Sequence, residues 1–251
     1  MADLLDSHFL LFVAIGLCAQ LIDGALGMAY GLVSSSILLA MGMPPAAVSA
    51  SVHTAEVFTT GVSGAAHGIL GNVDRRLMLR LAAPGVVGGV IGASLLSRID
   101  GEAIRPWIHG YLFVLALLIL LRAAGRRLPR GEVKRVGVLG FVSGLLDAIG
   151  GGGWGPMATS TLLARGGEAR TSIGTVSAAE FVVTLAISIT FLLSIGLEHW
   201  QVILGLLVGG VIAAPLAALL VRHVRERLVL FAVGGLVLAI SGVQTWLALA
   251  G

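Results

Sequence analysis

Apolar residues form long runs along nearly the whole chain, with short polar or glycine-rich stretches between them. Such runs are typical of transmembrane helices, which need about 20 predominantly apolar residues to cross a bilayer. Ten segments are predicted, at residues 9–22, 28–43, 46–70, 77–97, 106–122, 136–149, 154–164, 171–196, 199–221 and 228–249. The pattern predicts an all-α polytopic membrane protein with ten helical segments and no separate soluble domain.

The second half of the chain repeats the first. At a constant offset of 124 residues, fourteen positions are identical between residues 16–60 and 140–184, among them Asp23 with Asp147 and Glu56 with Glu180. Similarity at a fixed offset indicates a duplicated unit. We therefore divide the chain into a first transmembrane repeat (1–124), a basic cytoplasmic linker (125–135) and a second transmembrane repeat (136–251).

An odd number of segments in each repeat has a topological consequence. The second copy enters the membrane from the side opposite to the first, so the two five-segment repeats are predicted to be inverted. When the ten segments alternate, fourteen Lys and Arg residues fall on one side and only Arg98 and Arg105 on the other. Because cytoplasmic loops carry the excess of positive charge, both termini are predicted outside the cytoplasm.

The first, second, sixth and seventh segments are shorter than a membrane is thick. At about 1.5 Å per residue they reach only about 16 to 24 Å. We expect them to form two short or broken hairpins whose tips meet near the middle of the membrane, residues 145–155 from the outer face and residues 21–31 from the cytoplasmic face. If the hairpins spanned fully, Asp23 and Asp147 would lie near opposite surfaces, about 30 Å apart.

The second tip, LLDAIGGGGWG at 145–155, combines a carboxylate with four successive glycines. Non-helical backbone is tolerated at membrane depth only where protein buries it or where it lines a polar cavity. Successive glycines let backbone N–H groups converge on an anion, and the helix that follows directs its positive end to the same place. Close helix packing would use the same glycines. The candidate substrate-binding residues of the two tips are Gly24, Gly27, Tyr30, Gly150, Gly151, Gly152, Gly153 and Trp154.

Aromatic and hydroxyl side chains border both tips. Tyr30 and Trp154 close the two glycine loops, either as gates or as packing. Ser36 and Ser160 follow on the short second helix of each hairpin. A hydroxyl there either binds substrate oxygens or returns a hydrogen bond to its own helix, and both roles are left open.

A polar stripe follows one face of the third segment, and the eighth segment repeats it. Its members are three or four residues apart, as on one helical face: Ser49, His53, Glu56, Thr60, Ser63 and His67, then Ser177, Glu180, Thr184 and Ser188. A carboxylate at mid-membrane is costly as an anion, so it can take or release a proton. Candidate coupling groups are Asp23, Asp147, Glu56, Glu180 and His53. The alternative is hydrogen bonding that holds the repeats together.

Composition narrows the functional classes. Of 251 residues, 57% are hydrophobic and 12% are charged, and the basic residues lie in short loops between apolar runs, where membrane orientation explains them without a nucleic-acid partner. The single Cys18 permits no internal disulfide. No motif predicts a metal or a cofactor, and without a phosphate-binding loop ATP is not the direct energy source.

The chain resembles the TauE/SafE sulfite exporter family, also called the 4-toluene sulfonate uptake permease family. The resemblance lies in the duplicated glycine-rich hairpins, in Gly71-Asn72-Val73-Asp74-Arg75 after the third segment, and in Ile173-Gly174-Thr175-Val176-Ser177 before Glu180. It covers essentially the whole chain, and it implies a multi-pass transporter of the bacterial cytoplasmic (inner) membrane for sulfite, sulfonates or related small sulfur oxyanions. The family's usual glycine-rich stretch has no obligatory aspartate, so Asp23 and Asp147 mark a subgroup.

The leading hypothesis is a secondary transporter that exports a small sulfur oxyanion, sulfite or a related sulfonate, by alternating access. Because four carboxylates repel an anion, they must be protonated or hold a cation; a proton or cation co-substrate is therefore left open, as is a homodimer. One alternative is a channel for small anions, which lacks a closed intermediate. Another is an intramembrane aspartyl enzyme with Asp23 and Asp147 as an acid–base dyad. The two aspartates occupy repeat-equivalent positions, as a transporter's symmetry predicts, so we predict no enzymatic activity.

Overall fold

The computed structural model describes residues 7–26, 28–125, 131, 133–196, 198–220 and 226–250. In this part of the chain all regular secondary structure is helical. The elements are α1 (Ser7–Leu26), α2 (Tyr30–Ala40), α3 (Pro45–Ile69), α4 (Arg75–Leu96), α5 (Gly101–Ala123), α6 (Val136–Gly150), the π-helical turn η2 (Gly155–Thr159), α7 (Ser160–Ala164), α8 (Ala169–Ile195), α9 (Trp200–Leu220) and α10 (Glu226–Ala250). The all-α fold with ten helical segments is confirmed.

Local sequence explains several helix ends. The Asp74 carboxylate accepts hydrogen bonds from the backbone N–H groups of Arg76 (2.9 Å) and Leu77 (3.0 Å), and so caps the start of α4. Pro45 occupies the first turn of α3, where its missing N–H leaves no bond unmade. Gly151 follows α6 with φ of 69°, a left-handed conformation that favours glycine.

The surface of the bundle is apolar over most of its height, as a lipid-facing surface must be. Four of the described helices are long and apolar enough to cross a membrane: α4, α5, α8 and residues 227–247 of α10. Three exposed tryptophans, Trp107, Trp200 and Trp246, lie on α5, α9 and α10 near the end of the bundle opposite the basic loops. Tryptophan is enriched where a membrane meets water. The chain is therefore a multi-pass membrane protein.

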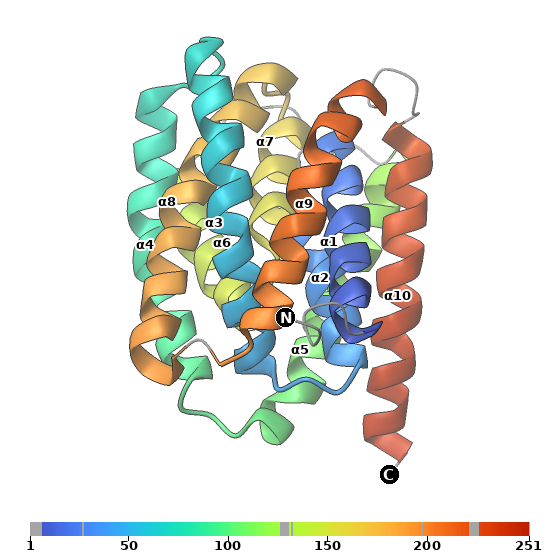
Figure 1. Cartoon of the computed structure of the whole chain (residues 1–251). Coiled ribbons are helices and arrows are strands. Elements are labelled where there is room, and N and C mark those ends of the chain that lie inside the picture. Colours follow the sequence, from blue (N-terminus) through green and yellow to red (C-terminus); the bar gives the residue numbers. More distant parts are fainter. Residues whose placement is uncertain are drawn as a thin grey trace.

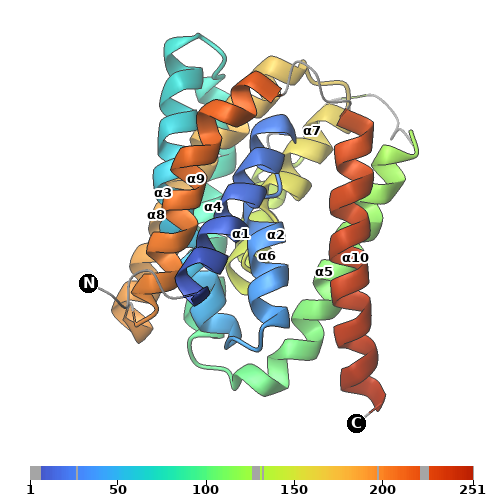
Figure 2. The ribbon, with the colours of Figure 1, turned by 45° about the vertical axis from the view of Figure 1, so that its right-hand side comes forward.

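The first hairpin consists of α1 and α2, and the second consists of α6, η2 and α7. The two hairpins open at opposite ends of the bundle (Figures 1 and 2). The start of α6 and the end of α7 share one pocket with the start of α4, at the end that carries the basic loops. The end of α2 instead lies beside the start of α5, where the Arg105 side chain is 3.5 Å from the Leu39 carbonyl oxygen. The hairpins therefore approach each other from opposite ends.

The tips of the two hairpins meet inside the bundle. A Cβ atom added at Gly31 would lie 2.9 Å from the Gly151 carbonyl oxygen and 2.9 Å from the Cα of Gly152. Contacts this close between two stretches of backbone require glycine. The two tips therefore meet, as expected, and their depth in a membrane stays a prediction.

Two details differ from the sequence-based expectation. Helix α1 continues through Asp23 to Leu26 and has 20 residues, so about 30 Å, whereas α2 has 11 and α6 has 15. A single intramembrane carboxylate does not end a helix when its side chain finds a partner. In addition, α6 and α7 open at the basic end, so with that end in the cytoplasm residues 145–155 come from the cytoplasmic side, opposite to the direction expected.

The most extensive helix contacts join the first half of the chain to the second: α1 with α9, α6 with α4, α3 with α8, and α5 with α10. Glycines bring these helices together, since Gly16 packs on Leu206, and Gly144 packs on Gly85. Gly88 likewise packs on the backbone of α6, and Gly209 on the backbone of α1. Tight packing through small residues is how helices associate in a bilayer.

One contact relates the two halves directly. The hydroxyls of Thr60 on α3 and Thr184 on α8 are 3.4 Å apart, and the two residues are repeat-equivalent. A residue can touch its own counterpart only near a local symmetry axis. The contact therefore places α3 and α8 side by side where the two halves meet, while the orientation of the repeats relative to a membrane stays a prediction.

We predict that Gly144→Ala destabilises the protein. The added methyl group would collide with the Gly85 carbonyl oxygen, so α4 and α6 would have to separate. A loss of about 1 to 3 kcal/mol is expected, measured as a lower Tm of the purified protein in neutral detergent. Gly110→Ala on α5 is the control, because nothing lies within 4 Å of a Cβ atom there. An equal loss in both variants would contradict the close α4–α6 contact.

Candidate functional site

Asp147 satisfies the backbone at the second hairpin tip. Its side chain is buried, and its Oδ1 accepts hydrogen bonds from the backbone N–H groups of Gly153 (2.7 Å) and Trp154 (2.9 Å). These are the N–H groups that a helix start leaves without intrahelical partners. Two backbone N–H groups of this tip therefore converge on one acceptor, the protein's own carboxyl group, and binding of an anion by the glycine run stays a prediction.

The first tip contains a looser version of the same contact. Asp23 Oδ1 accepts a hydrogen bond from the backbone N–H of Tyr30 at 3.3 Å, and Tyr30 is the counterpart of Trp154. Gly24 lies inside α1, and Gly27 lies outside the described residues. Among the described residues, the second tip is therefore held by two short bonds to its aspartate, and the first by one long bond.

His53 joins α3 to the second tip. Its Nδ1 is 2.8 Å from the Ser49 carbonyl oxygen, which can only accept, so Nδ1 carries a hydrogen. The Ser49 hydroxyl donates elsewhere, to the Ala148 carbonyl oxygen at 2.6 Å. The other ring nitrogen, Nε2, is 3.1 Å from Asp147 Oδ2. One proton therefore lies between Nε2 and Oδ2, and the buried pair is either an ion pair or two neutral groups.

Glu56 lies on α3 and Glu180 on α8. Glu56 is buried against the first tip, where a Cβ at Gly31 would lie 3.1 Å from its Oε1. Glu180 is partly buried on α8, within electrostatic range of Glu56, Asp23 and Asp147. The four predicted carboxyl groups thus form one interacting cluster around the tips. Among the described residues no group of three or more His, Cys, Asp or Glu is placed to hold a metal ion.

The hydroxyl groups of the short helices divide into two kinds. Ser36 donates to the Leu32 carbonyl oxygen of its own helix at 2.7 Å, which is the structural alternative. Ser160 instead accepts a hydrogen bond from the Arg122 guanidinium at 3.0 Å. Arg122 also lies 3.5 Å from the sulfur of Met28, at the first tip. The sequence used Arg122 only as an orienting charge, but the structure places it where α5 and the two hairpins meet.

Packing accounts for much of the four-glycine run. A Cβ at Gly152 would collide with the backbone of Gly31 and Leu32, and one at Gly150 or Gly153 would collide with the Tyr111 side chain. The remaining member, Gly151, accepts a hydrogen bond from the Ser35 hydroxyl through its carbonyl oxygen. The glycines therefore serve close packing and also expose their backbone to polar groups.

Sequence reasoning missed Tyr111. The Tyr111 hydroxyl on α5 is buried over the glycine turn and has no hydrogen-bond partner in the described structure. Burying an unpaired hydroxyl is unfavourable, so such a group needs an explanation. The one signal in the sequence was a lone polar aromatic residue in an apolar run.

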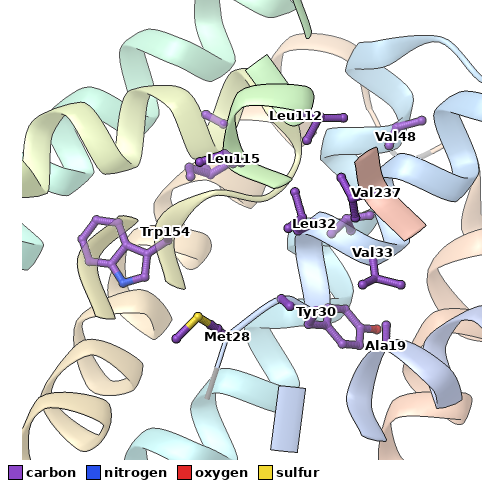
Figure 3. Close-up of a cluster of buried hydrophobic side chains, with 14 of the residues drawn as sticks. Ala19, Met28, Tyr30, Leu32, Val33, Val48, Leu112, Leu115, Trp154 and Val237 are labelled. Carbon is purple, nitrogen blue, oxygen red and sulfur yellow. The ribbon is translucent and has the colours of Figure 1, made fainter. Parts of the chain in front are cut away.

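Tyr30 and Trp154 are buried packing residues in this state. Figure 3 shows both among the apolar side chains around the first tip, with Met28 between them and Leu112 and Leu115 of α5 nearby. The Tyr30 hydroxyl donates to the Leu206 carbonyl oxygen on α9 at 3.1 Å. The Trp154 indole donates to the Val176 carbonyl oxygen on α8 at 3.2 Å. Their predicted role as gates stays a prediction.

We predict that Tyr111→Phe leaves the stability of the protein unchanged or increases it. The substitution removes an unpaired buried hydroxyl and keeps the ring that packs on the glycines. Tyr30→Phe is the matched comparison, because it removes a hydroxyl that is bonded to Leu206 and should cost about 0.5 to 1.5 kcal/mol. Thermal unfolding of both variants in detergent tests this. A larger loss for Tyr111→Phe than for Tyr30→Phe would show that Tyr111 has a partner.

Comparison with known proteins agrees with this architecture. The chain matches the family described as sulfite exporter TauE/SafE over residues 12–245. It is 42% identical over 252 residues to the probable membrane transporter protein YtnM of Bacillus subtilis (strain 168), an alignment that covers 95% of this chain and 84% of that protein. No solved structure matches the chain. The family match and the transporter-named relative indicate a transporter and not an enzyme, and the chain belongs to the TauE/SafE sulfite exporter family of membrane transporters.

Proposed function

We propose that the protein exports a small sulfur oxyanion, such as sulfite, by alternating access, and that a proton accompanies the anion. The observation that carries the proposal is the meeting of the two tips, which brings backbone N–H donors and four carboxyl groups together between the hairpins. Membership of a sulfite exporter family and the similarity to a probable membrane transporter support it.

The oxyanion and the Asp147 carboxylate compete for the same donors. Gly153 and Trp154 direct their N–H groups at one acceptor, and Asp147 occupies that position here. A proton on Asp147 removes the charge that competes with the substrate and weakens its hold on the two N–H groups. His53, 3.1 Å away, is the group that supplies or receives this proton. The anion then binds through neutral backbone donors.

This competition makes the proton and the anion occupy the site together. Both then leave on the side to which the site opens, so the coupling is co-transport. Export of an anion that keeps a net negative charge is favoured by a potential that is negative inside, by about 2.3 kcal/mol per elementary charge per 100 mV. The Arg122 guanidinium between α5 and the tips offsets part of the repulsion from the four carboxyl groups.

A transporter fits the structure better than a channel does. The backbone of Gly152 packs directly on Gly31 and Leu32, so the two tips close the path between them. A channel needs a continuous open path in its conducting state. We further propose that the protein lies in the bacterial inner membrane with its basic end in the cytoplasm, and that residues 1–124 and 136–251 act as the two inverted repeats.

We predict that Asp147→Asn abolishes the pH dependence of transport. Asparagine keeps an oxygen that can accept from the two N–H groups, but it cannot exchange a proton with His53. Sulfite efflux from proteoliposomes, measured across imposed pH gradients, should fall at least about tenfold and become insensitive to pH. Asp100→Asn, at the exposed start of α5, is the control and should retain both flux and pH response. Unchanged efflux in Asp147→Asn at every pH would refute the proposed coupling.

The proposed orientation predicts which loops are accessible from outside the cell. In a Cys18→Ser background, Glu198→Cys lies before α9 and Ala124→Cys lies after α5, at opposite ends of the bundle. A maleimide that does not cross membranes should label Glu198→Cys in intact spheroplasts, and Ala124→Cys only after lysis. Labelling in the reverse order would place the basic end outside.

A further inference from the structure

An open pocket lies away from the tips, at the basic end of the bundle. It has a volume of about 390 Å³ and is lined by the start of α4, the start of α6 and the end of α7. We call it the basic-end pocket. Among the described residues, its charged lining consists of Arg76, Arg80 and Arg165 with one acid, Asp74. Positive groups therefore outnumber negative ones in the described part of its wall.

The arginines of the basic-end pocket are suited to an anion. Arg76 and Arg80 are one helical turn apart on α4, so their side chains leave the same face. In the described structure neither forms an ion pair with a carboxylate. The acid beside them is already engaged, because Asp74 uses Oδ1 to cap α4. The two guanidinium groups on α4 are therefore available to a ligand.

The remaining wall of the pocket strengthens this interaction. Val136 and Leu162 are buried and apolar, and they form the part of the lining that lies toward the bundle. An apolar wall lowers the local dielectric constant, so the attraction between a guanidinium and an anion is stronger than in open water. Guanidinium groups bind oxyanions through two parallel hydrogen bonds.

We propose that the basic-end pocket is a second oxyanion site, in which Arg76 and Arg80 hold a sulfur or phosphorus oxyanion. The pocket lies at the mouth of the hairpin whose tip carries Gly150–Gly153, since Val136 begins α6 and Arg165 follows α7. The occupant is either a free substrate anion on its way to the tips or the phosphate of a phospholipid at the membrane surface. Its role in loading the transporter rests on the proposed function, whereas binding of an anion does not.

Binding is tested first on the purified full-length protein in neutral detergent, at constant ionic strength. Sodium sulfite or inorganic phosphate at millimolar concentration should raise Tm by a few degrees, because a ligand that binds only the folded state stabilises it. The double variant Arg76→Gln/Arg80→Gln should lose this shift. The control is Arg75→Gln/Arg135→Gln, which removes the same charge from the same end but from residues outside the pocket lining. Equal shifts in both double variants would overturn the proposal.

Transport in proteoliposomes then distinguishes the two sources of the anion. If the pocket loads the substrate, Arg76→Gln/Arg80→Gln should raise KM for sulfite about tenfold with little change in kcat, in phosphatidylcholine alone. If it holds a lipid phosphate, phosphatidylglycerol should stimulate the unmodified protein and the control but not this variant. Absence of sulfite flux in the unmodified protein, with the Tm shift intact, would refute the proposed substrate and leave the oxyanion site standing. Absence of the Tm shift with sulfite flux intact would refute the oxyanion site and leave the proposed substrate standing.

Discussion

The rest of the structure depends on one constraint: a helix that breaks inside a membrane must have its backbone satisfied by protein, because lipid offers no hydrogen bonds. The break between α6 and η2 meets this requirement with side chains from several elements. Asp147 accepts from Gly153 and Trp154, Ser49 on α3 donates to Ala148, and Ser35 on α2 donates to Gly151. The second tip is therefore completed by the first repeat, and the two halves have to meet where they do.

Under the proposed function, the same constraint links stability to transport, because the protein's own acceptor holds the position that we propose an anion takes. Among the described residues the two tips are not equal in this respect, since Asp147 has two bonds of 2.7 and 2.9 Å and Asp23 has one of 3.3 Å. Such an asymmetry is compatible with the proposed alternating access between two repeats.

Much of the architecture could be predicted from the sequence, because hydrophobic runs mark helices and a constant offset marks a duplication. The predicted meeting of the glycine-rich tips also agrees with the structure. What could not be predicted is pairing across elements. Spacing on α3 places His53 near Glu56, yet His53 Nε2 contacts Asp147, which is 94 positions later in the chain. The contact forms because α6 brings Asp147 to the imidazole ring. Periodicity describes one helix at a time. The packing of Tyr111 on the glycine turn and the length of α1 depend on contacts between segments, so periodicity does not predict them.

The exchange of helix partners between the two halves has a consequence for biosynthesis. Helix α1 packs mainly on α9, and α4 packs mainly on α6, so these helices depend on the other half of the chain for most of their packing. The ribosome completes α1 long before it makes α9. During that interval Gly16, which will lie against Leu206, faces lipid or another helix. The packing surface of α1 is then incomplete. The last helices to emerge therefore close a structure begun by the first, and insertion must hold α1 in place until its partner arrives.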